Sequence, residues 1–300
     1  MKNVIITGAN SGLGFETAKK IAAKQDYRLI LACRNMEKAE SAKNAIVSET
    51  GNENVETMQV DTSSLASVRA FAEKVIAKGE KIYALVNNAG ISSMGNGGLT
   101  EDGYDKVFET NYLGHFLLTQ LLLPYMEEDG RIYNVSSDMH NPPGGVTWPG
   151  AEAVMHPQGE DRKNYSYSKL AMIYMAHVLA GKLKEEGKQI TVNCFNPGFM
   201  ADTNFMKGGN TNFMKNGGGR NFMKEGGSKV GEFFVKHAMA DRYGDLEKSS
   251  DALAALVTEA EYGAYSGEYF DRSVNTARSS ELSYNEENAA ELWAASMQCI

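Results

Sequence analysis

Short apolar runs alternate along the chain with longer segments in which apolar residues recur every three or four positions. The short runs are rich in β-branched side chains, which is typical of buried strands. They cover residues 3–7, 28–32, 55–60, 84–87, 131–136, 189–195 and 267–270. The longer segments predict helices at 12–24, 36–50, 64–77, 103–127, 165–186 and 246–259, with a last amphipathic helix at 284–297.

This alternation of strand and helix argues for a parallel sheet that is covered by helices on both faces. With right-handed crossovers the chain then forms a single-domain, Rossmann-like, doubly wound α/β fold of about seven strands over residues 1–300. In such sheets ligands bind at the carboxyl ends of the strands, so we expect the functional residues there.

Two segments interrupt the alternation. Residues 138–164 are rich in Pro and Gly and contain Trp148. Residues 204–228 repeat Asn-Phe-Met-Lys at 204–207, 212–215 and 221–224, between glycines that disfavour a helix. We expect both segments to be loop insertions at the mouth of a pocket. The alternative for the repeat is a tolerated duplication on the surface.

Charge and cysteine content narrow the class of function. The formal net charge is −8, which repels phosphate backbones and anionic lipid headgroups, so no nucleic-acid or membrane partner is expected. Cys33, Cys194 and Cys299 form no CxxC pair, which argues against a disulfide framework or a metal site. The first apolar run is too short for a signal-peptide core, and the longest, 116–126, cannot span a bilayer. We expect a soluble, cytoplasmic protein.

A glycine-rich turn lies between the first predicted strand and the first predicted helix. It reads Thr7-Gly8-Ala9-Asn10-Ser11-Gly12-Leu13-Gly14. Glycines permit a tight turn and let backbone N–H groups approach a pyrophosphate, and the helix N-terminus adds free donors and a favourable dipole. The spacing is Gly-x3-Gly-x-Gly rather than Gly-x-Gly-x-x-Gly, and the alternative is an ordinary glycine-rich turn. Its position between strand and helix favours nucleotide binding.

The end of the second predicted strand carries a basic residue. NAD enzymes usually have an acid about 20 residues beyond the glycines, where it holds the ribose hydroxyls. Here that position is Arg34, whose guanidinium can bind a 2′-phosphate bidentately, with a hydroxyl contact from Ser11. The residues therefore favour NADP(H) over NAD(H). The alternative is that Arg34, which lies near Glu37, is a solvated surface charge.

Tyr165 and Lys169 lie four residues apart at the start of a predicted helix, so their side chains project from one face. A free tyrosine has a pKa of about 10, too high for a base at neutral pH. A neighbouring ammonium would stabilise the phenolate and lower that pKa, which makes the pair a plausible proton donor and acceptor. Tyr167 is a weaker choice because the residue four positions on is Ala171.

Seven motifs follow one another along the chain. They are the Thr7–Gly14 turn, Asp61 after the third strand, Asn87-Asn88-Ala89-Gly90 after the fourth, Asn111, Ser136-Ser137 after the fifth, Tyr165-x3-Lys169, and Pro197-Gly198 after the sixth. Each is weak alone. In this order, and in register with the strands, they resemble the short-chain dehydrogenase/reductase family over nearly the whole chain.

The resemblance implies four catalytic residues, Asn111, Ser137, Tyr165 and Lys169. Tyr165 would protonate the carbonyl oxygen as hydride arrives, or remove the alcohol proton in reverse. Lys169 would lower the pKa of Tyr165 and bind the nicotinamide ribose, and Asn111 would help hold a water that relays protons through Lys169. Ser137 would polarise the substrate oxygen. It is preferred to Ser136 because the family's serine is usually the second of such a pair.

The resemblance also implies which residues bind the cofactor. The turn would hold the pyrophosphate, the third-strand end the adenine, and the sixth-strand end the nicotinamide. The full set is Gly8, Asn10, Ser11, Gly12, Leu13, Gly14, Arg34, Asp61, Thr62, Asn88, Ala89, Gly90, Tyr165, Lys169, Pro197, Gly198, Met200 and Thr203. Two alternatives stay open: Asn88 and Asn111 could mainly satisfy buried backbone groups, and Asp61 could cap the following helix.

Within the family, four segments resemble the retinol dehydrogenase and light-dependent protochlorophyllide reductase branch. They are Ala32–Arg34, Asn111–Phe116, Ser168–Ala171 and Pro197–Thr203. The protochlorophyllide enzymes carry a cysteine where this chain has Phe199, and usually an alanine where it has Gly90. These departures count against the pigment reaction, and the expected lack of a membrane anchor counts against a retinoid.

The expected substrate is a bulky, mostly apolar carbonyl or alcohol, because methionine and aromatic side chains make adaptable apolar pockets. Ser137, His140 and Phe199 are the expected substrate-binding residues. Other candidates from the two loops are Trp148, Phe205, Met206, Phe213 and Met214. The alternative for these aromatic and methionine residues is local packing of long loops.

Three functions therefore compete. The first is an NADP(H)-dependent oxidoreductase acting on CH–OH or C=O groups. The second is a protochlorophyllide reductase-like reduction of a C=C bond, and the third is a non-catalytic NADP-binding sensor, which would typically lack the tyrosine or the lysine. An epimerase or dehydratase ranks below these because it favours another glycine spacing. The family often pairs subunits through the helices expected at 103–127 and 165–186, which favours a homodimer, although extended loops can leave monomers.

Overall fold

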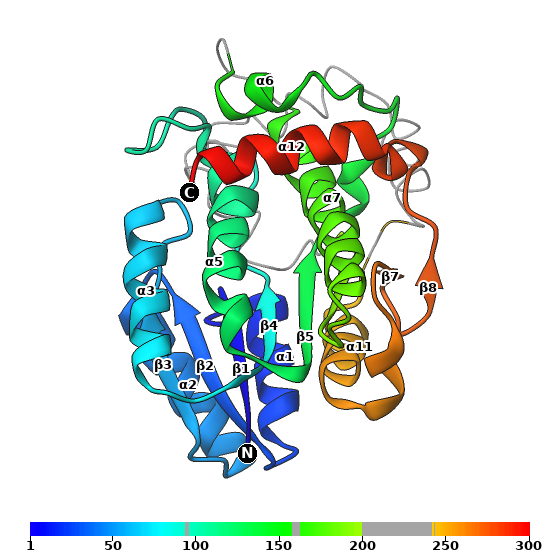
Figure 1. Ribbon diagram of the computed structural model, residues 1–300. Helices are drawn as coiled ribbons and strands as arrows, with labels where there is room; N and C mark the ends of the chain where they lie inside the picture. Colours follow the sequence, from blue (N-terminus) through cyan, green and yellow to red (C-terminus); the bar gives the residue numbers. More distant parts are fainter. Residues whose placement is uncertain (94–95, 158–162, 200–241, 243) are drawn as a thin grey trace, which may run out of the picture.

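A mostly parallel sheet forms the centre of the protein in a computed structural model that describes residues 1–93, 96–157, 163–199, 242 and 244–300 (Figure 1). Its eight strands lie in the order β3-β2-β1-β4-β5-β6-β7-β8. They are β1 (Lys2–Thr7), β2 (Tyr27–Cys33), β3 (Val55–Gln59), β4 (Ile82–Asn87), β5 (Met126–Val135), β6 (Thr191–Asn196), β7 (Tyr269–Asp271) and β8 (Thr276–Ala277). Neighbours from β3 to β7 pair in parallel, whereas β8 pairs antiparallel with β7. The expected doubly wound α/β sheet is confirmed, with β8 as an added edge strand.

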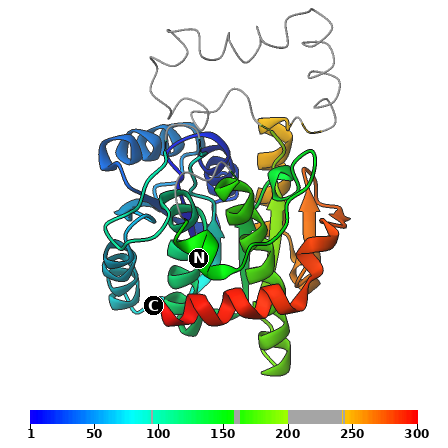
Figure 2. The ribbon, with the colours of Figure 1, turned by 90° about the horizontal axis from the view of Figure 1, so that it is seen from above.

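Helices cover both faces of this sheet (Figures 1 and 2). One face carries α1 (Gly12–Ala22), α2 (Met36–Thr50) and α11 (Leu246–Thr258), and the other carries α3 (Leu65–Ala77), α5 (Gly114–Leu122) and α7 (Asn164–Glu185). In β1, Val4 and Ile6 point into the core shared with α1, whereas Ile5 points into the core shared with α5 and α7. Within the described ranges, no helix is both long and apolar enough to cross a membrane.

The segment expected as one helix over 103–127 is a composite. It begins with α4 (Lys106–Phe108), widens into a π-helical turn, η1 (Glu109–Leu113), and continues as α5. It ends in a 3₁₀ turn, η2 (Leu123–Tyr125), where Pro124 has no N–H to continue the helix. The single-helix prediction was therefore wrong, and π-helical turns of this kind are frequent at functional sites.

The C-terminal helix, α12 (Glu286–Gln298), lies across α7 on the outer face of the molecule (Figure 1). Leu292 is fully buried, and Trp293 packs edge-on against Phe116 of α5 with ring centroids 4.9 Å apart. The helix therefore occupies part of the surface through which pairing of two copies was expected.

Trp148 belongs to the same layer as α12. Its indole N–H donates to Glu291 of α12 at 3.1 Å, and its ring meets Tyr167 and Tyr174 of α7 edge-on. The loop residues around it include α6 (Ala151–Met155), whose N–H at Ala151 also donates to Glu291. For Trp148, packing of a long loop is thus what the structure shows, because the loop folds down onto α12.

Truncating Leu292 tests how firmly α12 is attached. We expect Leu292→Ala to lower the free energy of unfolding by about 2–5 kcal/mol in urea titrations, because it leaves a cavity under the helix. Met297→Ala, on the exposed side of the same helix, is the matched control and should stay within about 0.5 kcal/mol of the unsubstituted protein. Equal losses for both variants would contradict this packing.

Glu109, the first residue of the π-helical turn, is a fully buried carboxyl. Its side chain is hydrogen-bonded to the Thr100 hydroxyl. Burial raises the pKa of Glu109 to about 8, the Thr100 hydrogen bond opposes this, and the nearby Asp102 carboxyl adds to it. Glu109 is therefore largely protonated at neutral pH.

Glu109→Gln should raise the melting temperature more at pH 8 than at pH 5. The folded protein holds this proton more tightly than the unfolded chain, where the pKa is 4.5, so stability falls as the pH rises from 4.5 towards 8. A glutamine has no proton to lose, and melting curves at the two pH values would show its advantage growing. Glu101→Gln, at an exposed position, is the control. An advantage that does not change with pH would show that Glu109 is not protonated.

Candidate active site

The turn between β1 and α1 has the close geometry that a pyrophosphate requires. Gly8 and Gly12 have φ angles of +67° and +57°, a left-handed conformation that favours glycine. A Cβ on Gly14 would lie 2.6 Å from Asn88 Nδ2 and 2.9 Å from the Gly8 carbonyl oxygen. The side chain of Ser11, the N-cap of α1, makes no capping hydrogen bond, so the first N–H groups of the helix are not occupied by it. These features fit a dinucleotide phosphate.

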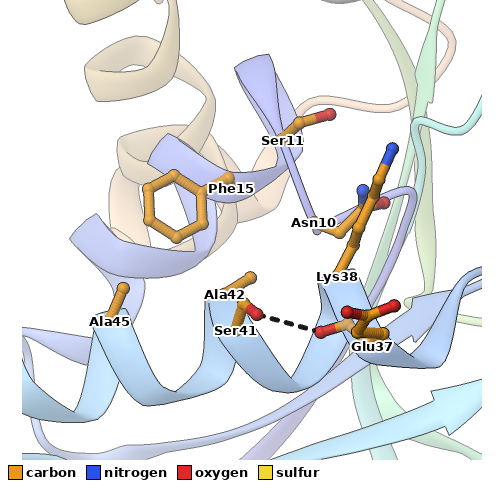
Figure 3. Close-up of a pocket in the computed structure, with 8 residues that line it drawn as sticks. All are labelled: Asn10, Ser11, Phe15, Glu37, Lys38, Ser41, Ala42 and Ala45. Atoms are coloured by element: carbon orange, nitrogen blue, oxygen red, sulfur yellow. Dashed lines mark hydrogen bonds between the residues drawn. The ribbon is translucent and has the colours of Figure 1, made fainter.

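A pocket of about 430 Å³ opens between this turn and the start of α2 (Figure 3). It is lined by Asn10, Ser11, Phe15, Glu37, Lys38, Ser41, Ala42 and Ala45. The Lys38 side chain extends across the pocket towards Asn10. Lys38 was not among the residues expected from the sequence, although a second cation in the first turn after Arg34 was a signal for it.

Arg34 and Asp61 lie at the ends of β2 and β3 and face each other. Arg34 Nη1 is 3.8 Å from Asp61 Oδ2, and the Arg34 side chain is 64% exposed, so the guanidinium is largely free to reorient. The Asp61 carboxylate accepts hydrogen bonds from the N–H and hydroxyl of Ser63, whereas Ser64 caps α3. The helix-cap interpretation of Asp61 is therefore wrong. Thr62, expected beside the adenine, is buried.

The segment after β4 is fastened to the end of β1. The Thr7 hydroxyl oxygen accepts the N–H groups of Asn88 and Ala89, each at 2.9 Å. Asn88 Nδ2 donates to the Thr7 carbonyl oxygen at 2.7 Å. The Asn88 side chain thus satisfies a backbone group, which is the structural alternative raised from the sequence. A contact with the cofactor remains a prediction for Asn88–Gly90.

Asn111 lies in the π-helical turn and joins three elements. Its Oδ1 accepts the Ile91 N–H at 2.8 Å, and its Nδ2 donates to the Ile91 carbonyl at 3.0 Å and to Ser168 Oγ at 3.0 Å. Both amide hydrogens are therefore used, and Asn111 also satisfies backbone groups. Any bound water would have to use an oxygen atom of this residue.

Lys169, on α7, is 4% exposed, and its ammonium donates to the Val135 carbonyl at the end of β5 at 2.9 Å. Burial lowers the pKa of Lys169 to about 8. A Cβ on Gly90 would lie 3.6 Å from Lys169 Nζ and 3.1 Å from Asn111 Oδ1. Glycine at position 90 thus keeps open a space that borders both side chains. The two ammonium hydrogens not given to Val135 suit a ribose hydroxyl and a water.

Tyr165 and Ser137 meet in front of Lys169. The Ser137 side chain lies near enough to the Tyr165 hydroxyl to lower its pKa through hydrogen bonding, and Lys169 Nζ is 5.7 Å from the centre of the Tyr165 ring. Ser136, in contrast, is buried and donates its hydroxyl to the Lys169 carbonyl. The structure therefore separates the two serines and leaves Ser137 beside the tyrosine, and the catalytic role of Ser137 stays a prediction.

The pKa of Tyr165 is raised, whereas the sequence predicted that it would be lowered. Burial raises it to about 12, the hydrogen bond with Ser137 opposes this, and the charge of Asp138 adds to it. Lys169 is not among the groups that shift this pKa, and its ammonium donates to the Val135 carbonyl. Without nucleotide, Tyr165 is therefore a protonated phenol at neutral pH.

His140 is buried behind Ser137. Its Nδ1 lies 2.6 Å from the Ser137 carbonyl oxygen, and its Nε2 accepts the Ser280 N–H at 3.1 Å. Both ring nitrogens thus have partners in the protein, so His140 supports Ser137. The adjacent Asp138 accepts from Asn196 at 2.8 Å and pairs with Arg272 at 3.2 Å, an arrangement that the sequence did not reveal because the partners are far apart in the chain.

The nicotinamide end of the expected site is described as far as residue 199. Gly198 has φ of +77°, and its N–H donates to Asn196 Oδ1. The Pro197 carbonyl accepts a hydrogen bond from the Ser249 hydroxyl. The backbone of Phe199 bonds to Arg242 and Gly244. Predicted residues that lie outside the described ranges are Met200, Thr203, Phe205, Met206, Phe213 and Met214, with the repeat segment 204–228.

Comparison with known proteins agrees with this geometry. A family model for short chain dehydrogenase matches residues 2–150. The chain is 34% identical to human (Homo sapiens) retinol dehydrogenase 13 over 305 aligned residues, covering 100% of this chain and 84% of the relative. A crystal structure of a Mycobacterium Paratuberculosis protein superposes with a TM-score of 0.68 at 26% identity, covering 100% of this chain and 93% of that one.

A further solved structure shares the fold. It is L-sorbose reductase from Gluconobacter frateurii complexed with NADPH and L-sorbose, with a TM-score of 0.65 at 21% identity and coverage of 93% of this chain and 97% of that one. Fold, motif order and these similarities agree. The chain belongs to the short-chain dehydrogenase/reductase family, in its retinol dehydrogenase-like branch.

Proposed function

We propose that this protein is an NADP(H)-dependent oxidoreductase that moves a hydride between the nicotinamide and the carbonyl or alcohol carbon of a bulky, mostly apolar substrate. The family to which it belongs comprises oxidoreductases that use nicotinamide cofactors on alcohol and carbonyl groups. The observation that carries the proposal is the meeting of Ser137, Tyr165 and Lys169 at the carboxyl end of β5.

The chemistry follows from the protonation states of these side chains. Bound NADPH supplies the hydride in the reductive direction. Tyr165, protonated at neutral pH, gives its proton to the carbonyl oxygen, which Ser137 holds by a hydrogen bond. Lys169, positive below about pH 8, would hold the ribose and would stabilise the phenolate that Tyr165 leaves. The oxidative direction requires that phenolate at the start, so it is favoured by higher pH.

The choice of NADP(H) rests on two cations beside the glycine turn. Arg34 is exposed at the end of β2, and Lys38 lines the pocket with Asn10 and Ser11 (Figure 3). A phosphate on the ribose 2′ position would meet both positive charges and the Ser11 hydroxyl, whereas a 2′-hydroxyl would gain little from them. Glu37 lines the same pocket, and its carboxylate would repel a phosphate, so it weakens the preference for NADP(H) over NAD(H).

The substrate class rests on the retinol dehydrogenase-like relatives and on the apolar loop residues. The relative named retinol dehydrogenase 13 suggests a long apolar alcohol or aldehyde. Phe199, which follows the end of β6, is the expected substrate-binding aromatic residue within the described ranges, and its ring would meet such a chain. We therefore expect large apolar aldehydes and ketones, retinal among them, to be turned over faster than small ones.

Replacing Tyr165 with Phe tests the reaction. With NADPH and a panel of retinal, large ketones, small aldehydes and quinones, the unsubstituted protein should oxidise NADPH, and Tyr165→Phe should lower kcat about 10²–10⁴-fold. The Kd for NADPH should change less than about twofold, since the phenol hydroxyl carries little of the binding energy. Tyr167→Phe, two residues along α7 with its ring packed on Trp148, is the control and should keep its turnover. Undiminished turnover in Tyr165→Phe would refute the assignment, and NADPH binding without any turnover by the unsubstituted protein would favour a sensor.

Replacing Arg34 tests the cofactor. Arg34→Ala should weaken NADPH binding about 10–100-fold, because it removes a charge-assisted hydrogen bond, and should change NADH binding less than about twofold. Lys38→Ala should act in the same direction. Lys43→Ala, on α2 but not among the residues that line the pocket, is the matched control. Titration of each variant with both nucleotides, followed by cofactor fluorescence, gives the values. Parallel losses of NADPH and NADH affinity would exclude a 2′-phosphate site here.

A further inference from the structure

His115, in the first turn of α5, is a buried histidine for which the reaction described above has no use. It is 0% exposed. Its Nδ1 lies 3.0 Å from the backbone carbonyl oxygen of Asn111, and its Nε2 lies 2.9 Å from the hydroxyl of Thr7. The ring therefore bridges the π-helical turn that carries Asn111 and the end of β1, where the glycine turn begins.

The partners of the ring fix its tautomer. A carbonyl oxygen can only accept, so Nδ1 must carry the hydrogen that is given to Asn111. The Thr7 hydroxyl oxygen already accepts the N–H groups of Asn88 and Ala89, which fills both of its lone pairs. The hydroxyl hydrogen must then be donated, and Nε2 at 2.9 Å is nearer than the Val86 carbonyl at 3.4 Å. His115 is thus neutral, with Nδ1–H donating and Nε2 accepting.

Protonation of the ring would break this chain of hydrogen bonds. An Nε2–H would point at a hydroxyl oxygen that has no free lone pair, and the ring would carry a buried positive charge near that of Lys169. Burial lowers the pKa of His115 to about 4, and the nearby charge of Lys169 acts in the same direction, while the hydrogen bond to Asn111 opposes both. The neutral form therefore persists over the physiological range.

The bridge ends at the residue that organises the proton-transfer side of the site. Asn111 holds Ile91 and Ser168 through its amide, and its Oδ1 shares the open space beside Gly90 with the Lys169 ammonium. The backbone of Asn111 lies in a π-helical turn, where the hydrogen-bond ladder of a regular helix is interrupted. The hydrogen bond from His115 Nδ1–H holds the Asn111 carbonyl group, and with it the backbone of this turn, in one orientation.

We propose that His115 is a positioning residue of the reaction, whose neutral ring holds Asn111 in place against Lys169 and ties that residue, through Thr7, to the Asn88–Ala89 segment beside the cofactor. This inference rests on the proposed function. Of the two hydrogen bonds that the His115 ring makes, the one from Nδ1–H to the Asn111 carbonyl is the one that positions Asn111. Loss of the Nε2 bond should matter less, since the Thr7 hydroxyl can turn to the Val86 carbonyl.

Two amide substitutions separate the two halves of the ring. In His115→Asn, the side-chain N–H₂ takes the position of Nδ1 and can still donate to Asn111. In His115→Gln, the amide reaches the position of Nε2 and can still accept from Thr7, but the donor to Asn111 is lost. His115→Leu removes both. We expect kcat for NADPH-dependent reduction to stay within about threefold for His115→Asn and to fall about tenfold or more for His115→Gln and His115→Leu, with the Kd of NADPH within about twofold throughout.

Each outcome decides the matter. Equal losses of kcat for His115→Asn and His115→Gln, or losses that follow melting temperature alone, would show a merely structural histidine. Turnover by His115→Leu equal to the unsubstituted protein would also overturn the proposal. If the unsubstituted protein turns over nothing in the panel, the proposed function and this inference fail together, whereas failure of the inference alone leaves turnover intact and sensitive to Tyr165→Phe.

A second measurement needs no variant to fold well. In ¹⁵N-histidine spectra of the unsubstituted protein, His115 should show one neutral tautomer with the hydrogen on Nδ1, unchanged between about pH 5.5 and 8. Its signals can be assigned by their loss in His115→Asn. An Nε2–H tautomer, or a titration midpoint near 6.5, would contradict the hydrogen-bond chain from which the proposal was built.

Discussion

The hydrogen bond from the Lys169 ammonium to the Val135 carbonyl is the contact around which the site is built. A buried ammonium is stable only if its hydrogens find partners, and the carboxyl end of a central strand supplies one. The remaining two hydrogens face the space beside Gly90, next to Tyr165. Under the proposed function this space would take the nicotinamide ribose, while Ser136 donates its hydroxyl to the Lys169 carbonyl and Ser137 would meet the substrate.

A second set of hydrogen bonds holds the surrounding elements together. Thr7, at the end of β1, binds the segment after β4 with its hydroxyl and its carbonyl, and binds His115 of α5 as well. Gly114 allows α5 to approach closely, since a Cβ there would lie 2.2 Å from the Thr62 carbonyl oxygen. The glycine turn, α5 and the segments that follow β3 and β4 are thus joined through buried hydrogen bonds and close packing.

Much of the fold and of the candidate site could be predicted from the sequence, because the alternation of strands and helices and the spacing of motif residues are local properties. The parallel strands, the positive φ angles in the glycine turn and the shared face of Tyr165 and Lys169 all follow from them. The packing of Trp148 on α12 and the bridge made by His115 depend on partners 143 and 108 residues away in the chain, which no local pattern reveals. The raised pKa of Tyr165 was missed for a similar reason, since burial, the Ser137 side chain and the charge of Asp138 decide it.

The most direct test of the central claim is a crystal structure of the protein with NADP⁺. The account predicts that the pyrophosphate lies on the turn from Gly8 to Gly14, and that the Lys169 ammonium keeps its Val135 contact while it donates to a hydroxyl of the nicotinamide ribose. The Tyr165 hydroxyl would then face the nicotinamide ring. A nucleotide bound elsewhere, or a Lys169 side chain that leaves Val135 and turns away from the ribose, would contradict it.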